Sequence, residues 1–290
     1  MNDALHTAAL RKDYGPLHAL DGIDLTVPEG AFLLLVGRNG AGKTTLLRAL
    51  AGLVRAHGTL LVLGEDPRRR PGRPNPRLVY RSERSTLPAR FRVRDVLDLY
   101  TRIHPRFDRA RAEQHLKQAG VTALDLRLGP LSQGTLARIE AALLLAVDAE
   151  LVLLDEPLAG LDPVYRDLFW REFLVTYAEG RTVVVVTHRP EDVAGLFTHL
   201  AVLDSGRLVA FEEADRLRCR YRSVLVPPER AAEARALQPL AVRPHWGRDA
   251  FLFRDLPEET LARLGEGVPT EFPDVVRALL SSPSPTGVLP

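Results

Sequence analysis

The chain has 290 residues, 46% of them hydrophobic, with 39 Lys and Arg against 37 Asp and Glu. This length favours one large domain with a smaller addition, and the net charge of +2 argues against a protein that wraps nucleic acid through a large positive charge. One cysteine, Cys219, excludes an intrachain disulfide framework and a multi-cysteine metal site, and no apolar run reaches the ~18 residues of a membrane span or forms a secretory signal.

Apolar runs alternate with helical stretches, which predicts an α/β fold with a mainly parallel sheet. The expected strands are residues 23–27, 31–36, 151–154 and 182–187. The run 31–36 is continuously apolar, as expected for a strand that is buried on both faces. The expected helices are residues 44–51 and 163–177; Pro163 suits the first turn of the second helix, and Gly180 lies just past its end.

The segment 37–44 reads Gly-Arg-Asn-Gly-Ala-Gly-Lys-Thr and matches the phosphate-loop pattern G-x-x-x-x-G-K-[ST] between a strand and a helix. Glycines let successive backbone N–H groups point into one concavity, and the helix that follows adds its positive end. We therefore expect a nucleoside triphosphate, with Lys43 on its β- and γ-phosphates and Thr44 on Mg²⁺. The expected nucleotide-binding residues here are Gly37, Arg38, Asn39, Gly40, Ala41, Gly42, Lys43, Thr44 and Thr45.

Residues 67–94 are rich in Arg and Pro, with ten arginines in 68–94, and are expected to form an exposed connector. Beyond them, helical periodicity at residues 93–101, 109–119 and 132–147, without a convincing strand, predicts a helical subdomain over about 93–147.

Two carboxylates follow the apolar run 151–154. A strand that ends in Asp155 and Glu156 delivers both to the edge of the sheet where ligands bind in open α/β folds. Asp155 is expected to hold Mg²⁺, and Glu156 to act as the general base toward a water molecule. His188 follows the strand 182–187 and is expected to stabilise charge on the γ-phosphate.

The first domain is expected to span residues 1–217. Short strands at 221–226 and 250–254, with helices at 229–237 and 258–264, predict a small α+β domain over 218–280. The tail 281–290, Ser-Ser-Pro-Ser-Pro-Thr-Gly-Val-Leu-Pro, is expected to be disordered.

From about residue 5 to 217 the chain resembles the nucleotide-binding subunits of ATP-binding cassette (ABC) transporters. Besides the phosphate loop and the strand that ends in Asp155, four features carry the resemblance. Tyr14 resembles the aromatic residue that stacks on adenine. The segment 131–135, Leu-Ser-Gln-Gly-Thr, resembles the signature loop. The segment 159–162, Ala-Gly-Leu-Asp, resembles the loop that crosses between subunits. Thr187-His188 with the segment 202–207 resembles the switch-histidine region.

The resemblance implies that two such subunits close head to tail around ATP and Mg²⁺. Ser132 and Gly134 of one subunit would then contact the γ-phosphate that the other subunit holds, at the N-terminus of a helix. The chain carries one copy of each motif, so it implies a homodimer or a heterodimer with a related subunit. Such subunits are cytoplasmic and reach the inner face of the membrane through a permease.

Two positions depart from the family pattern. Gln133 and Thr135 stand at the third and fifth places of the signature, commonly Leu-Ser-Gly-Gly-Gln. Glu83 stands where a Gln usually senses Mg²⁺ and the membrane partner; it could accept a metal-bound water or be a surface acid in an Arg-rich loop.

The leading interpretation is the ATPase subunit of an exporter with a separate permease. In it, a groove beside Glu83 would receive a permease helix, framed by Arg81, Arg84 and Arg90. Residues 272–279 resemble the closing helix of a C-terminal extension in that branch. The alternatives are a soluble ABC ATPase that acts on nucleic acid or ribosomes through the Arg-rich segment, and an inert ATP-binding regulator.

Overall fold

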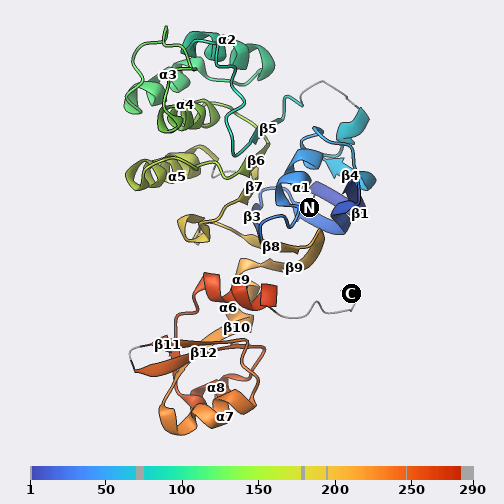
Figure 1. Ribbon diagram of the computed structural model, residues 1–290, viewed down its shortest axis with the longest axis vertical. Helices are drawn as coiled ribbons and strands as arrows, with labels where there is room; N and C mark the ends of the chain where they lie inside the picture. Colours follow the sequence, from blue (N-terminus) through green and yellow to red (C-terminus); the bar gives the residue numbers. More distant parts are fainter. Residues whose placement is uncertain (1, 70–74, 178–179, 194, 246, 282–290) are drawn as a thin grey trace.

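The computed structural model describes residues 2–69, 75–177, 180–193, 195–245 and 247–281 (Figure 1). Residues 282–290, which make up most of the predicted disordered tail, lie outside the described residues, as do Arg70 and Arg73 of the Arg-rich segment.

A six-stranded sheet forms the centre of the molecule, with strand order β5-β6-β7-β3-β8-β9. Its strands are β3 (Phe32–Gly37), β5 (Leu78–Arg81), β6 (Leu151–Asp155), β7 (Thr182–Val186), β8 (His199–Asp204) and β9 (Arg207–Glu213). The first five in spatial order are parallel, and β9 runs antiparallel to β8. The predicted α/β fold with a mainly parallel sheet is therefore confirmed for this sheet.

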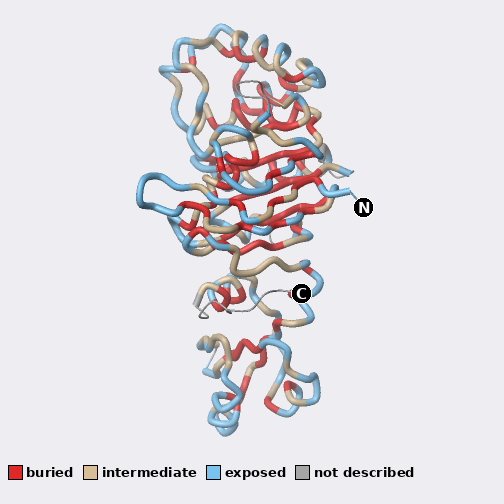
Figure 2. Tube along the Cα trace, turned by 90° about the vertical axis from the view of Figure 1, so that its right-hand side faces the viewer, coloured by how far each residue is buried: buried red, intermediate tan, exposed pale blue. Residues whose placement is uncertain are grey.

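The central strands are apolar throughout because both faces of the sheet are covered. Alternate residues of β3 take part in two cores: Leu34 packs with helices on one side, and Leu35 with α1 (Lys43–Leu50) on the other. Helix α5 (Pro163–Tyr177) contributes three buried aromatic side chains to the first core, Phe169, Trp170 and Phe173. In Figure 2, most residues of the central strands are coloured red, as buried. Burial on both sides removes the polar alternation that a half-exposed strand would show.

A second, antiparallel sheet of order β2-β1-β4 packs against α1. It contains β1 (Asp3–Tyr14), β2 (Leu17–Pro28) and β4 (His57–Val62). Sequence periodicity predicted only residues 23–27 of this sheet, because β1 and β4 carry several polar residues and no long apolar run. The turn between β1 and β2 places Tyr14 opposite Leu17.

The helical subdomain is confirmed as three helices, α2 (Val93–Ile103), α3 (Arg109–Gln118) and α4 (Gln133–Leu145), which share a core of their own. The expectation that residues 67–94 form an exposed connector is wrong for β5, where Leu78 and Val79 are buried beside β6. The short helix η1 (Pro67–Arg69) precedes it.

Arg81 does not frame a surface groove, contrary to the sequence interpretation. Its side chain is 11% exposed, and Nη2 lies 2.6 Å from Oε2 of Glu140 in α4. Burial raises the pKa of Glu140, while the charge of Arg81 lowers it. The ion pair joins the end of β5 to α4, the long helix of the subdomain. A guanidinium group that is mostly shielded from water needs such a carboxylate partner.

The C-terminal part begins with α6 (Ala214–Arg220) and forms a four-stranded antiparallel sheet of order β11-β12-β10-β13. Its strands are β10 (Tyr221–Val226), β11 (Ala241–His245), β12 (Arg248–Arg254) and β13 (Glu266–Val268). One face packs on α7 (Ala231–Ala236), which follows the single turn η3 (Pro228–Arg230), and on α8 (Glu258–Leu264). The strands and helices predicted here are present.

The last helix, α9 (Phe272–Ser281), lies between the C-terminal sheet and the central sheet (Figure 1). Its Asp274 pairs with Arg243 of β11, with Oδ2 3.3 Å from Nη1. Val275, Ala278 and Leu279 join the core that contains Leu200 and Val202 of β8. The division at residue 217 stays a prediction. In the described part of the chain, no helix combines the length and apolarity needed to cross a membrane.

Candidate functional site

The loop between β3 and α1 approaches the backbone of neighbouring strands so closely that only glycine fits. A Cβ atom at Gly37 would lie 2.1 Å from the carbonyl oxygen of Leu203, and one at Gly42 would lie 2.3 Å from that of Ala19. Gly42 also has a φ of 101°, a left-handed conformation that favours glycine. Packing therefore requires glycine at positions 37 and 42, whereas a Cβ atom at Gly40 would meet no atom within 4 Å.

Lys43 begins α1 and lies in the concavity of this loop. Its Nζ donates hydrogen bonds to the carbonyl oxygens of Gly37 at 2.8 Å and Arg38 at 2.9 Å. Burial lowers the pKa of Lys43, and the nearby carboxylates of Glu156 and Asp155 raise it. The ammonium is thus held over the loop at the point where phosphate oxygens would enter.

Asp155 is the last residue of β6 and is 2% exposed. Burial raises its pKa and the Thr44 side chain lowers it through a hydrogen bond, while Glu83 adds negative charge that raises it. The Tyr80 hydroxyl donates to Oδ2 of Asp155 at 3.5 Å. Thr44, Glu83 and Asp155, the three residues expected at Mg²⁺, line one cavity, and their hydroxyl and carboxylate oxygens are donors that suit this ion.

Glu156 adopts a left-handed backbone conformation, with φ of 49°, directly after the strand. Its N–H donates to the carbonyl oxygen of Val186 at 2.9 Å, which fixes it beside the end of β7. Oε1 of Glu156 lies 3.5 Å from Nε2 of His188. Burial raises the pKa of Glu156, while His188 lowers it. The parallel strands β6 and β7 therefore bring the predicted base and histidine together.

One cavity of about 430 Å³ gathers most of the predicted residues. It is lined by Tyr14, Asn39, Gly40, Ala41, Gly42, Lys43, Thr44, Thr45, Glu83, Asp155, Glu156 and His188, and also by Leu17, Ala19 and Val186. Gly37 and Arg38 line a neighbouring cavity with His188 and α9 instead.

Three apolar residues of the lining, Leu17, Ala19 and Val186, were not predicted from the sequence. Leu17 is 61% exposed and pairs across the hairpin with Tyr14, which is 45% exposed. The Gly-Pro dipeptide between them was a turn signal that would have brought the two side chains together. Nζ of Lys12 lies 4.8 Å from the centroid of the Tyr14 ring, so a cation covers one face of this aromatic residue.

Ser132 and Gly134 lie outside this cavity. Oγ of Ser132 caps α4 by accepting from the N–H of Thr135 at 3.2 Å. A Cβ atom at Gly134 would lie 3.4 Å from the carbonyl oxygen of Gly160, so the 131–135 and 159–162 segments are neighbours. An ion pair of 2.7 Å joins Arg138 to Asp162 across them.

A sequence profile described as "ABC transporter" matches residues 20–159. The Daunorubicin resistance ATP-binding protein DrrA2 of Streptomyces coeruleorubidus is 34% identical over 220 residues, which cover 74% of this chain and 68% of that protein. The Nod factor export ATP-binding protein I of Cupriavidus metallidurans is 34% identical over 215 residues, which cover 72% of this chain and 71% of that protein.

Solved structures share the fold. An ATP-binding subunit of an ABC transporter superposes with a TM-score of 0.67 at 22% identity and covers 74% of this chain and 92% of that one. An ATP-binding cassette of an ABC transporter in its ADP conformation gives a TM-score of 0.57 at 23% identity. This likeness covers 73% of this chain and 92% of that one. About a quarter of the chain is not covered by this likeness.

Proposed function

Because this chain belongs to the ABC transporter family of ATP-binding proteins, we propose that it is the ATP-hydrolysing subunit of an exporter whose membrane permease is a separate polypeptide. The similar proteins are named for daunorubicin resistance and for Nod factor export, which supports export over import. In this role the chain works at the cytoplasmic face of the membrane, attached through the permease.

The observation that carries the proposal is the single cavity that unites the phosphate loop, Asp155, Glu156 and His188. Loop N–H groups and the N-terminus of α1 hold the phosphates, with Lys43 as a point charge. Tyr14 and Leu17 at the exposed mouth supply an apolar surface for the adenine. Thr44 and Asp155 would hold Mg²⁺, with Glu83 accepting from a metal-bound water; the ion would neutralise phosphate charge.

Glu156 is suited to orient the attacking water and accept its proton. Its carboxylate is buried at the end of β6, and burial favours a carboxylate that can take up a proton. His188 lies 3.5 Å from it and is 59% exposed at its side chain, so it can reach a γ-phosphate at the cavity mouth. Together they act on the terminal phosphate.

The site is completed by a second subunit. Ser132 is exposed at the start of α4 and lies outside the cavity of Lys43. Its position at a helix N-terminus suits a γ-phosphate that another molecule carries. A homodimer and a heterodimer would both support this chemistry, because in either case the partner would supply the loop that corresponds to residues 131–135.

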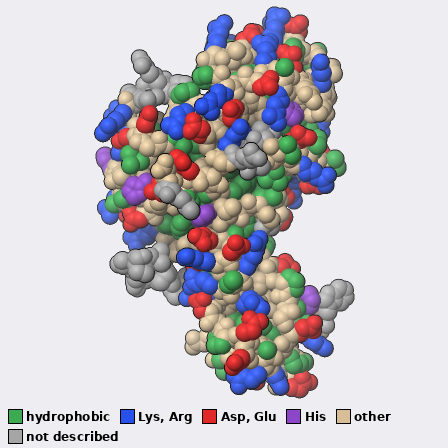
Figure 3. All heavy atoms as spheres, turned by 180° about the vertical axis from the view of Figure 1, so that it is seen from behind, with side chains coloured by type: hydrophobic (Ala, Val, Ile, Leu, Met, Phe, Trp, Pro, Cys, Tyr) green, Lys and Arg blue, Asp and Glu red, His purple; other side chains and the backbone are tan. Residues whose placement is uncertain are grey.

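The alternative of a nucleic-acid ATPase has less support. On the face seen in Figure 3, Lys and Arg side chains are interspersed with Asp and Glu, so no continuous basic surface is visible there. Several arginines of the Arg-rich segment are used internally: Arg68 pairs with Asp66, Arg77 with Glu150 and Arg81 with Glu140. These pairs reduce the charge available for phosphates of a nucleic acid.

The proposal is tested by measuring ATP turnover per molecule against protein concentration, with the oligomeric state followed by light scattering. A shared site predicts turnover that rises as dimers form. Full turnover by demonstrably monomeric protein would contradict the shared site. For the exporter role, a neighbouring reading frame that encodes a six-span membrane protein supports the proposal, whereas salt-dependent stimulation by DNA or RNA supports the alternative.

A further inference from the structure

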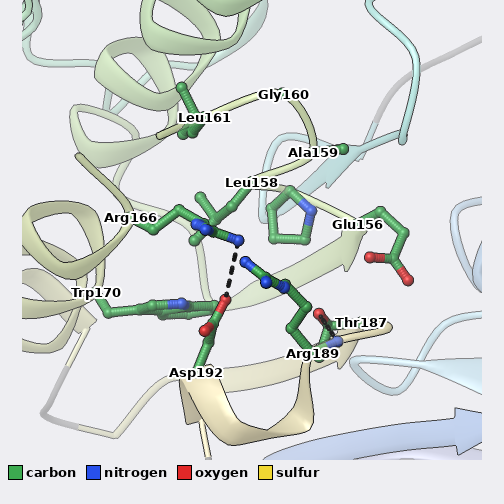
Figure 4. Close-up of a pocket in the computed structure, with 11 residues that line it drawn as sticks. Glu156, Leu158, Ala159, Gly160, Leu161, Arg166, Trp170, Thr187, Arg189 and Asp192 are labelled. Carbon is green, nitrogen blue, oxygen red and sulfur yellow. Dashed lines mark hydrogen bonds and ion pairs between the residues drawn. The ribbon is translucent and has the colours of Figure 1, made fainter. Parts of the chain in front are cut away.

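A second cavity, of about 210 Å³, lies against the segment 156–161 (Figure 4). Glu156 lines both this cavity and the nucleotide cavity, and so marks the boundary between them. The other polar side chains that line the second cavity come from α5 and from the turn that follows β7. These side chains are Arg166, Trp170, Thr187, Arg189 and Asp192.

Trp170 contributes a buried donor to this cavity. The residue is 6% exposed, and its Nε1 has no hydrogen-bond partner among the described residues. The indole ring lies beside Asp192 and below Arg166 in Figure 4. A buried N–H group without an acceptor is unfavourable, so a cavity next to it calls for a ligand that accepts hydrogen bonds.

Two guanidinium groups face the same space. The Arg166 side chain is 13% exposed, and its Nη1 lies 3.9 Å from Oδ2 of Asp192, beyond hydrogen-bond distance. Nε of Arg189 lies 3.9 Å from Oε1 of Glu191. Among the residues the structure describes, no hydrogen bond joins either guanidinium to an acceptor. The cavity therefore contains hydrogen-bond donors from two guanidinium groups and one indole that have no acceptor among the described residues.

Two acidic side chains also touch the cavity. Figure 4 shows the carboxylate of Glu156 directed away from Arg166 and Trp170. Burial raises the pKa of Asp192, while Arg166 and Arg189 lower it. These carboxylates, and that of Glu191 beside Arg189, balance the charge of the two guanidinium groups but form no hydrogen bond with them, so their donors and the indole N–H stay unused among the described residues.

We propose that this cavity binds a small tetrahedral oxyanion, and that its ligand is inorganic phosphate. Forked guanidinium donors match the oxygens of phosphate, and the Trp170 N–H supplies a further donor. The volume is several times the ~30 Å³ that one water molecule occupies, so an oxyanion and a few waters fit.

The role of the site rests on the proposed function, which releases phosphate at the other side of Glu156. Hydrolysis transfers the γ-phosphoryl group to water and leaves ADP and phosphate; no further covalent step is needed. Phosphate held beside the segment 156–161 would delay its return to solvent. The cavity would then act as a holding site for the product.

Binding is tested with Trp170 fluorescence in a Trp246→Phe background, with Mg²⁺ and a non-hydrolysable ATP analogue added to fill the phosphate loop. Potassium phosphate is titrated against potassium chloride at equal ionic strength. We expect a saturable change in emission with phosphate only. Arg166→Gln and Arg189→Gln should each raise the apparent Kd by about tenfold or more, since each removes a charged donor. Arg189 is 51% exposed at its side chain, so its replacement should leave folding intact.

The matched control is Arg171→Gln, an exposed arginine on the same helix as Arg166. It should titrate like the parent. No saturable change, or equal Kd values in all three variants, would overturn the site and leave an adventitious ion only. If phosphate titrates but the protein hydrolyses no ATP, the site stands and the proposed function fails. If ATP turns over while phosphate has no effect, the site fails alone.

The source of the phosphate is distinguished in a single-turnover reaction with a phosphate sensor. A lag between bond cleavage and free phosphate that shortens in Arg189→Gln, but not in Arg171→Gln, supports capture of the released product. Equal lags, with the titration retained, assign the site to phosphate from solution and still support an oxyanion site.

Discussion

The phosphate-loop side of the molecule and the Ser132 side differ in how their polar groups are held. In the first, Lys43 is 7% exposed and Asp155 is 2% exposed, and burial shifts both pKa values. In the second, Ser132 is exposed, and the side chains of Arg138 and Asp162 are 39% and 46% exposed. Groups held away from water are prepared for a charged ligand, whereas solvated groups act strongly only when a partner excludes the water.

The largest effect expected from this contrast is at Lys43. Lys43→Ala removes the buried ammonium and should abolish ATP binding, weakening affinity by roughly a hundredfold or more because a charged hydrogen-bond donor to the phosphates is lost. Binding of a fluorescent ATP analogue measures it. Lys117→Ala, an exposed lysine, is the control and should bind normally. Equal ATP affinities of the parent protein and Lys43→Ala would contradict the role of Lys43 in binding the phosphates.

Glu156→Gln separates binding from chemistry on the same side. Glutamine keeps the shape but accepts no proton, so ATP should still bind while turnover falls by roughly 10²–10⁴-fold. A nucleotide-bound dimer should accumulate in gel filtration. Glu259→Gln, an exposed glutamate in α8, is the control. Turnover that stays at the parental rate would exclude Glu156 as the general base.

Ser132→Arg tests the exposed side. The larger, positively charged side chain should leave the affinity of the monomer for ATP unchanged, because Ser132 lies outside the nucleotide cavity. It should block ATP-driven dimerisation and lower turnover by roughly tenfold or more, as expected when an anchoring contact in the middle of an interface is replaced. Thr122→Arg, at an exposed position of the same subdomain, is the control. Normal dimerisation of Ser132→Arg would refute the role of this loop in a second subunit's site.

The smallest effect near neutral pH is expected in the pH dependence of kcat, which reports on the burial of Glu156. Burial raises the pKa of Glu156 above that of an ordinary glutamate, so its carboxyl group keeps a proton at pH values where an exposed glutamate is ionised. The base must be ionised to act; activity is therefore lost as pH falls through this raised pKa, by up to about tenfold per pH unit below it. An acid limb at the pKa of a solvated glutamate would contradict the burial argument.

Sequence patterns predict structure best where the backbone geometry allows only one residue type. Gly37 and Gly42 of the phosphate loop lie so close to the backbone of Leu203 and Ala19 that no other residue fits there. Runs such as 151–154 signal a doubly buried strand, so the position of Asp155 at its end followed directly. Such patterns failed for β1 and β4, whose polar residues hide their pairing, and for Arg81, whose charge suggested a surface position although it is buried against Glu140. Strand pairing and ion pairing join residues far apart in sequence, and no local pattern records them.

The phosphate loop, the buried parallel strands and the helical subdomain could be predicted from local patterns, because each depends on residue spacing and on the side-chain periods of 2 and 3.6 residues. Long-range packing places α9 against the central sheet and keeps Ser132 outside the cavity of Lys43. It also brings Arg166, Trp170 and Arg189 around one cavity. These arrangements depend on which surfaces exclude water together, and that is fixed when the elements pack.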